Sequence, residues 1–416
     1  MSTNAGVAAF PAYAAGLPEP AAVGTRTAIN PIVRVAFYLF VLSIPFEIPN
    51  RTIPVEIPTL TGAVFLLATF LQPSACYRRL PAAVLWFMAY LWVFGLSTLV
   101  NRSGHSLLVA QLFLLLFQLV LILWVGANLL RDKTVLRGVV LALALACAVR
   151  AGMQLLGIGA TVRAVWTGGV RVTALGQNPN WSAIVLAAGL VTMLSMRPRL
   201  LTWPIAALTG VAIIQTGSRG GLVALAVGLL ALVWQGRTIA TRIRGLGVGL
   251  LALGILAFGV FRSDMLRTRL TAAAAEGSLA GRERIYPAAL SMIGERPFLG
   301  WGPIENQFEI AIRVGEERKD RRDAHNLVLD LLSATGLLGA IPFLLGIALC
   351  VRSAWRARHG PYGMLPFALA ATTLAGCISG TWIASKILWL SLAIGVAAGT
   401  MAWEQRSRQR ALGVLR

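Results

Sequence analysis

Apolar stretches long enough to cross a bilayer recur along almost the whole of this chain of 416 residues. A membrane-spanning helix needs about 20 mostly apolar residues, and hydrophobic residues make up 57% of the chain. Charged residues are only 13%, about half the share found in a soluble domain. Twelve stretches qualify: 33–49, 57–73, 80–99, 106–129, 137–157, 180–197, 200–216, 219–236, 245–262, 325–351, 362–382 and 384–403. The sequence therefore predicts an all-α polytopic membrane protein with about 12 transmembrane helices.

Basic residues mark the orientation of these helices. Short basic clusters follow every even-numbered stretch, among them Arg78 and Arg79, Arg131 and Lys133, and Arg406, Arg408 and Arg410. Because Lys and Arg in short loops favour the cytoplasmic side, both termini are predicted to be cytoplasmic. The net charge of +21 is therefore interpreted as a topology signal, and no basic region with interleaved aromatics suggests nucleic-acid binding.

The chain divides at its longest connection. We predict a poorly ordered cytoplasmic N-terminus over 1–30, helices one to nine over 31–262, a non-cytoplasmic loop over 263–324, helices ten to twelve over 325–403, and a cytoplasmic tail over 404–416. A long charged loop in a compact membrane protein is usually functional. It is expected to contain short helices, one of them over 282–293 with Ile285, Ala289 and Ile293 on one face.

Two arginine-containing turns are candidate phosphate sites on the outer side. In the first, Arg219 lies in a glycine-rich turn at the start of the eighth apolar stretch. Helix N-termini and arginines both suit phosphate oxygens. In the second, Arg282 and Arg284 open the loop helix, where their spacing prevents them from sharing one face. The alternatives are a tight turn whose Arg snorkels and an ordinary solvated helix terminus.

His325 lies where the charged loop meets the tenth apolar stretch. Histidine titrates near neutrality and can accept a proton from a hydroxyl. Asp323 or Asn326 would orient its ring, and Asp330 inside the apolar stretch favours a polar cavity. A surface histidine at the interface is the alternative.

A smaller outer loop near 157–180 carries Arg163, Arg171 and Asn180. Asn180 either caps the sixth helix or contacts sugars, as Trp166 and Trp301 would. The four cysteines contain no CxxC pair, so neither a disulfide framework nor a zinc site is indicated. No Walker loop, HExxH, GxSxG or outer acidic metal cluster is found.

Three blocks together resemble the O-antigen ligase and polymerase superfamily of bacterial envelope glycosyltransferases. His325-Asn326, nine residues and Gly336-Leu-Leu-Gly339 are similar to the ligase signature. Ser218-Arg219-Gly220 opens a span, as in the family. Gly281-Arg282 followed by 295–302 resembles the family's loop motif, although Tyr286 stands where the family often has Trp.

The resemblance implies glycosyl transfer at the periplasmic face of the inner membrane. An O-antigen polysaccharide on undecaprenyl pyrophosphate would pass, with inversion, to lipid A–core oligosaccharide without metal or other cofactor. Arg219 and Arg282 would hold the pyrophosphate and His325 would accept the hydroxyl proton. Arg284, Arg163, Arg171, Asn180 and Asn326 are weaker candidates for phosphate or sugar contacts.

Other functions remain open at this point. Within the superfamily, an O-antigen polymerase or a protein O-oligosaccharyltransferase is possible, and the short C-terminal tail argues against the latter. A lipid-linked glycan transporter would need intramembrane charges, of which Arg150 and Lys386 are the main examples. The sequence shows no clear internal repeat.

Overall fold

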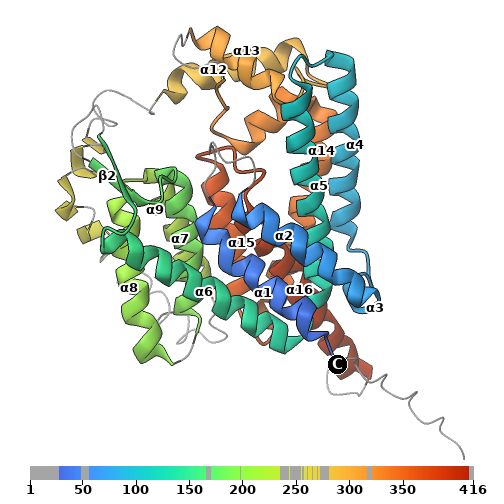
Figure 1. The fold of residues 1–416 in the computed structure, drawn as a ribbon, viewed down its shortest axis with the longest axis vertical. Coiled ribbons are helices and arrows are strands. Elements are labelled where there is room, and N and C mark those ends of the chain that lie inside the picture. The colour runs from blue at the N-terminus through green and yellow to red at the C-terminus, as the bar shows by residue number, and fades with distance from the viewer. Residues whose placement is uncertain are drawn as a thin grey trace, which may run out of the picture.

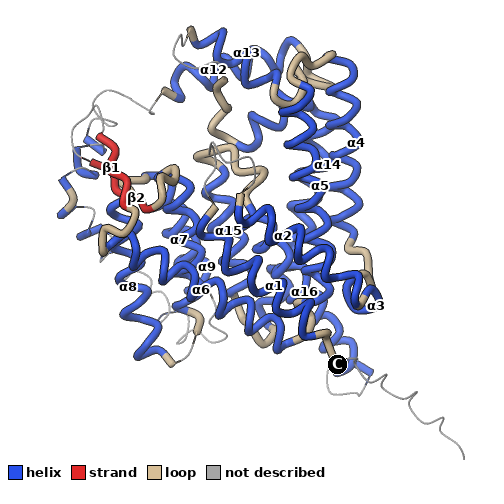
Figure 2. Tube along the Cα trace, viewed as in Figure 1, coloured by secondary structure: helices blue, strands red, loops and turns tan. Residues whose placement is uncertain are grey.

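The computed structural model describes residues 28–47, 56–164, 170–196, 198–234, 281–315 and 321–411, with scattered residues between 243 and 271. Most of the predicted N-terminal segment and of the ninth apolar stretch therefore lies outside the described residues. The parts described are almost entirely helical (Figure 2).

The helices follow one another along the chain with short connections. The first group is α1 (Pro31–Ser43), η1 (Ile44–Phe46), α2 (Ile57–Ala68), η2 (Thr69–Leu71), α3 (Pro73–Cys76), α4 (Ala82–Asn101), α5 (Ser106–Leu129) and α6 (Lys133–Leu155). After the strands β1 (Ala160–Ala164) and β2 (Val170–Ala174) come α7 (Pro179–Leu194), α8 (Arg199–Gln215) and α9 (Arg219–Val233). The last group is α12 (Arg282–Glu295), α13 (Glu305–Val314), α14 (Leu327–Arg356), η3 (Ala357–His359), α15 (Leu365–Cys377) and α16 (Lys386–Ala411).

A helix occupies each predicted apolar stretch that lies among the described residues. Within the described residues, five helices are long and apolar enough to cross a membrane: α4, α5, α6, α14 with η3, and α16. Six further apolar helices are shorter, at 10–17 residues. The prediction of a multi-pass helical membrane protein is confirmed in this form, whereas the number of crossings stays a prediction.

The helices pack in two groups. The long helix α14 packs against α4 and α16, and α16 also packs against α5. Helices α7, α8, α9 and α15 form the second group, with α6 beside α7 and α8. Helices α12 and α13 lie across one end of the long helices (Figure 1). The described part of the long loop before α14 is therefore folded onto the bundle at this end.

A two-stranded hairpin stands where the sequence predicted only a loop. Strands β1 and β2 pair antiparallel, with Arg163 directly opposite Arg171. The strands are rich in Val and Thr, whose branched side chains favour extended backbone. The hairpin is a small addition to an otherwise helical fold.

The segment after α12 is joined to α14 at a break in that helix. Gly336 has φ 62° and ψ −164°, so the helix does not continue through it. At the break, the carbonyls of Ser333 and Ala334 accept hydrogen bonds from outside the helix. Trp301 N donates to Ser333 O (2.8 Å) and Gly302 N donates to Ala334 O (3.0 Å). In return, Leu337 N donates to Pro297 O (2.8 Å). The segments 297–302 and 333–338 thus pair by backbone hydrogen bonds. These bonds satisfy backbone N–H and carbonyl groups that the break leaves without partners inside the helix.

Candidate active site

His325 lies immediately before α14 with an acidic partner. Its Nδ1 is 2.7 Å from Oδ1 of Asp323, which also accepts a hydrogen bond from the His325 backbone N at 3.1 Å. The imidazole is about one-third exposed, and its φ of 48° is a strained backbone conformation for a residue other than Gly. With Nδ1 directed at the carboxylate, Nε2 is the nitrogen left to accept a proton.

Asp323 is ionised under ordinary conditions. Although burial by itself raises the pKa of this carboxyl, the hydrogen bond from His325 and the nearby charges of His325 and Arg322 lower it below the usual range. The sequence left Asp323 and Asn326 as alternatives for orienting the ring. The contact is made by Asp323, whereas Asn326 caps α14 by accepting from the backbone N of Val328 (2.9 Å) and Leu329 (3.2 Å).

Arg282 is the first residue of α12, a helix predicted from the sequence. Its buried face is formed by Ile285, Ala289 and Met292, so the third position is Met292 instead of the expected Ile293. These side chains share a small apolar cluster with Ala324, the neighbour of His325. The start of α12 is therefore fixed against the segment that carries His325.

Arg219 opens α9, and its helix is capped by Ser218, whose Oγ accepts from Gly221 N at 3.0 Å. The next residue, Gly220, lies against Ser379, and a Cβ at this glycine would come within 2.2 Å of the Ser379 Oγ. Arg282 Nη2 donates to the Ser379 carbonyl at 2.7 Å. Ser379 thus brings Arg219 and Arg282 together, close enough for their like charges to repel each other.

A further arginine connects this pair to the histidine. A Cβ at Gly281 would lie 3.5 Å from the Arg322 guanidinium, which belongs to the residue before Asp323. The Arg282 Nε is buried and has no hydrogen-bond partner among the described residues. Two converging cations, one of which has an N–H still available to donate, can bind an oxyanion. His325, three residues after Arg322, can accept a proton.

The hairpin arginines lie at the edge of this arrangement. Arg171 Nε donates to Thr216 O (2.7 Å) and its Nη2 to Asn180 Oδ1 (2.8 Å), which ties β2 to the turn before Arg219. Asn180 therefore holds Arg171, and the cap of α7 is Asn178. Arg163 donates to Gly176 O at 3.1 Å. Arg284 is exposed on α12.

The predicted sugar-stacking role of Trp301 finds no support in its surroundings. Its ring is in contact with two guanidiniums, those of Arg296 at 4.0 Å and Arg313 at 4.9 Å from the ring centroid. Its indole N–H donates to Met292 O at 2.9 Å. These contacts join α12 to α13, while Trp166 lies outside the described residues.

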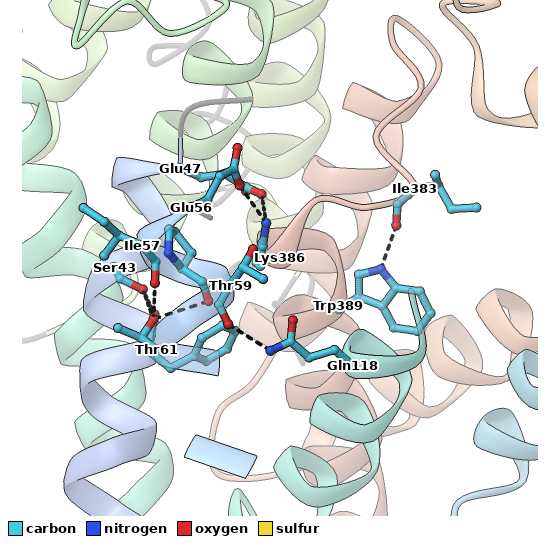
Figure 3. Close-up of polar contacts among 12 residues, drawn as sticks. Ser43, Glu47, Glu56, Ile57, Thr59, Thr61, Gln118, Ile383, Lys386 and Trp389 are labelled. Atoms are coloured by element: carbon cyan, nitrogen blue, oxygen red, sulfur yellow. Dashed lines mark hydrogen bonds and ion pairs between the residues drawn. The ribbon is translucent and has the colours of Figure 1, made fainter. Parts of the chain in front are cut away.

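A buried charge cluster at the N-terminus of α16 was only partly visible in the sequence (Figure 3). The ammonium group of Lys386 pairs with the buried carboxylate of Glu47, and with Glu56 at 3.0 Å. The Glu47 carbonyl accepts from Gln177 Nε2 at 2.7 Å, and Gln177 in turn accepts from Arg150 Nε at 3.0 Å. Lys386 and Arg150, the two charges that the sequence analysis noted within apolar stretches, thus link the N-terminus of α16 to α6 through Glu47 and Gln177.

The acidic partners were missed because they are remote in sequence. Glu47 and Glu56 flank the short connection between α1 and α2, and Glu47 is 339 positions from Lys386. Because burying an unpaired charge is costly, a lysine within an apolar stretch is expected to pair with an acid. The sequence alone does not identify which acid it pairs with.

Known proteins resemble the part of the chain that carries the site. Residues 204–344 match a family model described as Wzy_C, O-Antigen ligase, and this segment includes Arg219, Arg282 and His325. A region of 220 residues is 31% identical to the O-antigen ligase of Pseudomonas aeruginosa, covering 50% of this chain and 51% of that protein. The chain thus spans about half the length of this curated relative. The resemblance expected from the sequence motifs is confirmed.

Proposed function

We propose that this chain, whose residues 204–344 match the O-antigen ligase family model, is an O-antigen ligase. It transfers O-antigen polysaccharide from undecaprenyl pyrophosphate to lipid A–core oligosaccharide, as a metal-independent inverting glycosyltransferase. What supports this proposal is the approach of Arg219 and Arg282 at Ser379, with Gly281 near Arg322, the residue that precedes the Asp323–His325 pair.

Each residue has a defined task in the reaction. Arg219 and Arg282 bind the pyrophosphate and stabilise the negative charge that develops on it as it leaves. His325 Nε2 accepts the proton of the acceptor hydroxyl while that oxygen attacks the anomeric carbon from the opposite face. The new glycosidic bond forms as the bond from carbon to pyrophosphate oxygen breaks. Asp323 keeps the proton on Nδ1 and stabilises the imidazolium, in the manner known from hydrolase triads.

Two arginines of the β1–β2 hairpin are candidates to bind a second anionic group. Arg163 and Arg171 are directly opposite each other on β1 and β2, an arrangement that is destabilising for like charges. A phosphate of the donor or of the acceptor core would offset this repulsion. Arg284 is exposed and offers a further contact, whereas Asn180 acts through Arg171.

The proposed reaction also fixes the orientation of the protein in the membrane. The site faces the periplasm from the inner membrane, residues 263–324 form the periplasmic loop, and both termini are cytoplasmic. The partners are the two lipid-linked glycans and the surrounding bilayer.

Replacement of His325 tests the function. In a strain lacking the chromosomal copy, His325→Ala is expected to abolish O-antigen attachment while the protein still inserts into the membrane. The matched control is His105→Gln, since His105 also contacts a carboxylate, Glu305, at 2.9 Å. The control is expected to retain attachment.

The same strains separate the remaining family functions. Accumulation of lipid-linked polymer indicates a ligase, whereas a core capped by a single repeat indicates a polymerase. Glycan flux across vesicles without transfer indicates a transporter. Normal smooth lipopolysaccharide in His325→Ala would contradict the proposal, and loss of transfer on addition of a chelator would contradict its metal-free chemistry.

A further inference from the structure

A hollow of about 300 Å³ opens at the end of the bundle opposite the candidate active site. It lies where α6 begins, where the chain turns between η3 and α15, and where α16 ends. Its lining includes Arg131, Lys133, Pro361, Met401, Glu404 and Arg408. None of these residues has a part in the proposed transfer reaction.

Positive charge is in excess at the hollow. The Glu404 carboxylate is shared by Arg79, at 3.0 Å, and by Arg131. Lys133 and Arg408 add two more cations, and within the described residues neither side chain forms an ion pair or a hydrogen bond. Asp132, which lies between Arg131 and Lys133 in the chain, uses its carboxylate to cap α6 through the backbone N of Thr134 and Val135. A negatively charged ligand would therefore find a basic hollow with little competition.

The hollow also has apolar lining. Pro361 and Met401 line it beside the cations, and Trp403, at the same level of α16 but on another face, is 61% exposed. Tryptophans are enriched where a membrane protein meets the bilayer–water interface. The combination of cations in a hollow and apolar side chains beside it fits a molecule with an anionic head and hydrocarbon tails better than a soluble anion.

We propose that this hollow binds the phosphate headgroup of an anionic phospholipid from the adjacent leaflet. Lys133 and Arg408 contact the phosphate, and the acyl chains leave the hollow over Pro361 and Met401. Because Lys133 belongs to α6 and Arg408 to α16, the lipid joins the ends of two helices that Glu404 already links through Arg131. The site is independent of the glycosyl transfer.

Lipid retention by the full-length purified protein tests this proposal. Native mass spectrometry would compare phosphatidylglycerol with phosphatidylcholine, and thermal unfolding would be followed in nanodiscs of each lipid. Phosphatidylglycerol should be retained preferentially and should raise the Tm. Since each basic residue near an anionic surface contributes about fivefold in affinity, Lys133→Gln with Arg408→Gln should weaken retention by about 25-fold.

The control removes the same charge elsewhere on this end of the chain. Arg352 and Arg410 are exposed and do not line the hollow, so Arg352→Gln with Arg410→Gln should leave retention within about twofold of the wild type. Equal losses in the two double variants would overturn the site, because net charge alone would then explain binding. Displacement of the lipid by millimolar inorganic phosphate would identify a free-anion site instead. Retention should be unchanged in His325→Ala.

Discussion

His325 combines a strained backbone with a fixed side-chain partner. A positive φ in a residue other than Gly costs on the order of 1–3 kcal/mol and persists only where the surroundings enforce it. Here the enforcing groups are Asp323, which binds both the backbone N and the ring, and the Asn326 cap immediately after it. The strained backbone therefore holds the imidazole just before the N-terminus of α14.

Asp323→Asn is expected to lower kcat by about 100-fold with little change in KM, because the amide cannot stabilise an imidazolium as the carboxylate does. Since the folded-state pKa of Asp323 is lowered, its hydrogen-bonded carboxylate contributes stability that is present above about pH 4 and is lost as the pH falls further. Thermal unfolding at decreasing pH measures this loss, and a pH–rate profile of the reconstituted enzyme measures the change in kcat. Glu295→Gln, which removes a carboxylate paired with Arg313 on the same loop, should leave the profile unchanged.

At the scale of elements, the loop motif and α14 form one interlocked unit. A Cβ at Gly336 would lie 2.3 Å from the Phe298 carbonyl, and one at Gly300 would lie 2.7 Å from the Ala334 carbonyl. The sequence predicted both α12 and α14 from their apolar patterns. It did not predict the break between Thr335 and Leu337, because a single glycine in a long apolar stretch has no periodic signal that separates a kinked helix from a straight one.

Gly336→Ala should therefore destabilise the protein by on the order of 2–5 kcal/mol, through the positive φ and the clash with the Phe298 carbonyl. Thermal unfolding in detergent measures the effect. Gly294→Ala provides the control, because Gly294 lies in α12 with nothing within 4 Å of an added Cβ. Alanine favours helix over glycine by about 1 kcal/mol, so this variant should be as stable as the wild type or slightly more so. Equal destabilisation of both variants would contradict the interlock.

Across the whole molecule, the sequence predicted what depends on local pattern and missed what depends on distant contacts. Apolar stretches gave helices because any bilayer-facing segment must satisfy its own backbone. His325, Arg219 and Arg282 were predicted as site residues because their types and motifs indicate chemistry. The approach of Arg219 and Arg282 at Ser379 was not foreseeable, since Ser379 contributes only a carbonyl and a close contact, which have no signature in a sequence.

The Lys386 cluster shows how such distant contacts hold the bundle together, and a double-mutant cycle can measure it. Lys386→Met leaves the Glu47 carboxylate, whose side chain is only 5% exposed, without its cation, and should cost about 3–5 kcal/mol of folding free energy. Adding Glu47→Gln removes the stranded charge, so the double variant should be more stable than the sum of the single losses predicts, with a coupling of about 1–3 kcal/mol. Glu56→Gln should lower the folding free energy less than Lys386→Met does. The Glu56 side chain is 22% exposed, so water already screens its interaction with Lys386. Denaturant or thermal unfolding of the four proteins gives the coupling. Strict additivity would mean that Lys386 and Glu47 do not depend on each other, which would contradict the stabilising role of this pair.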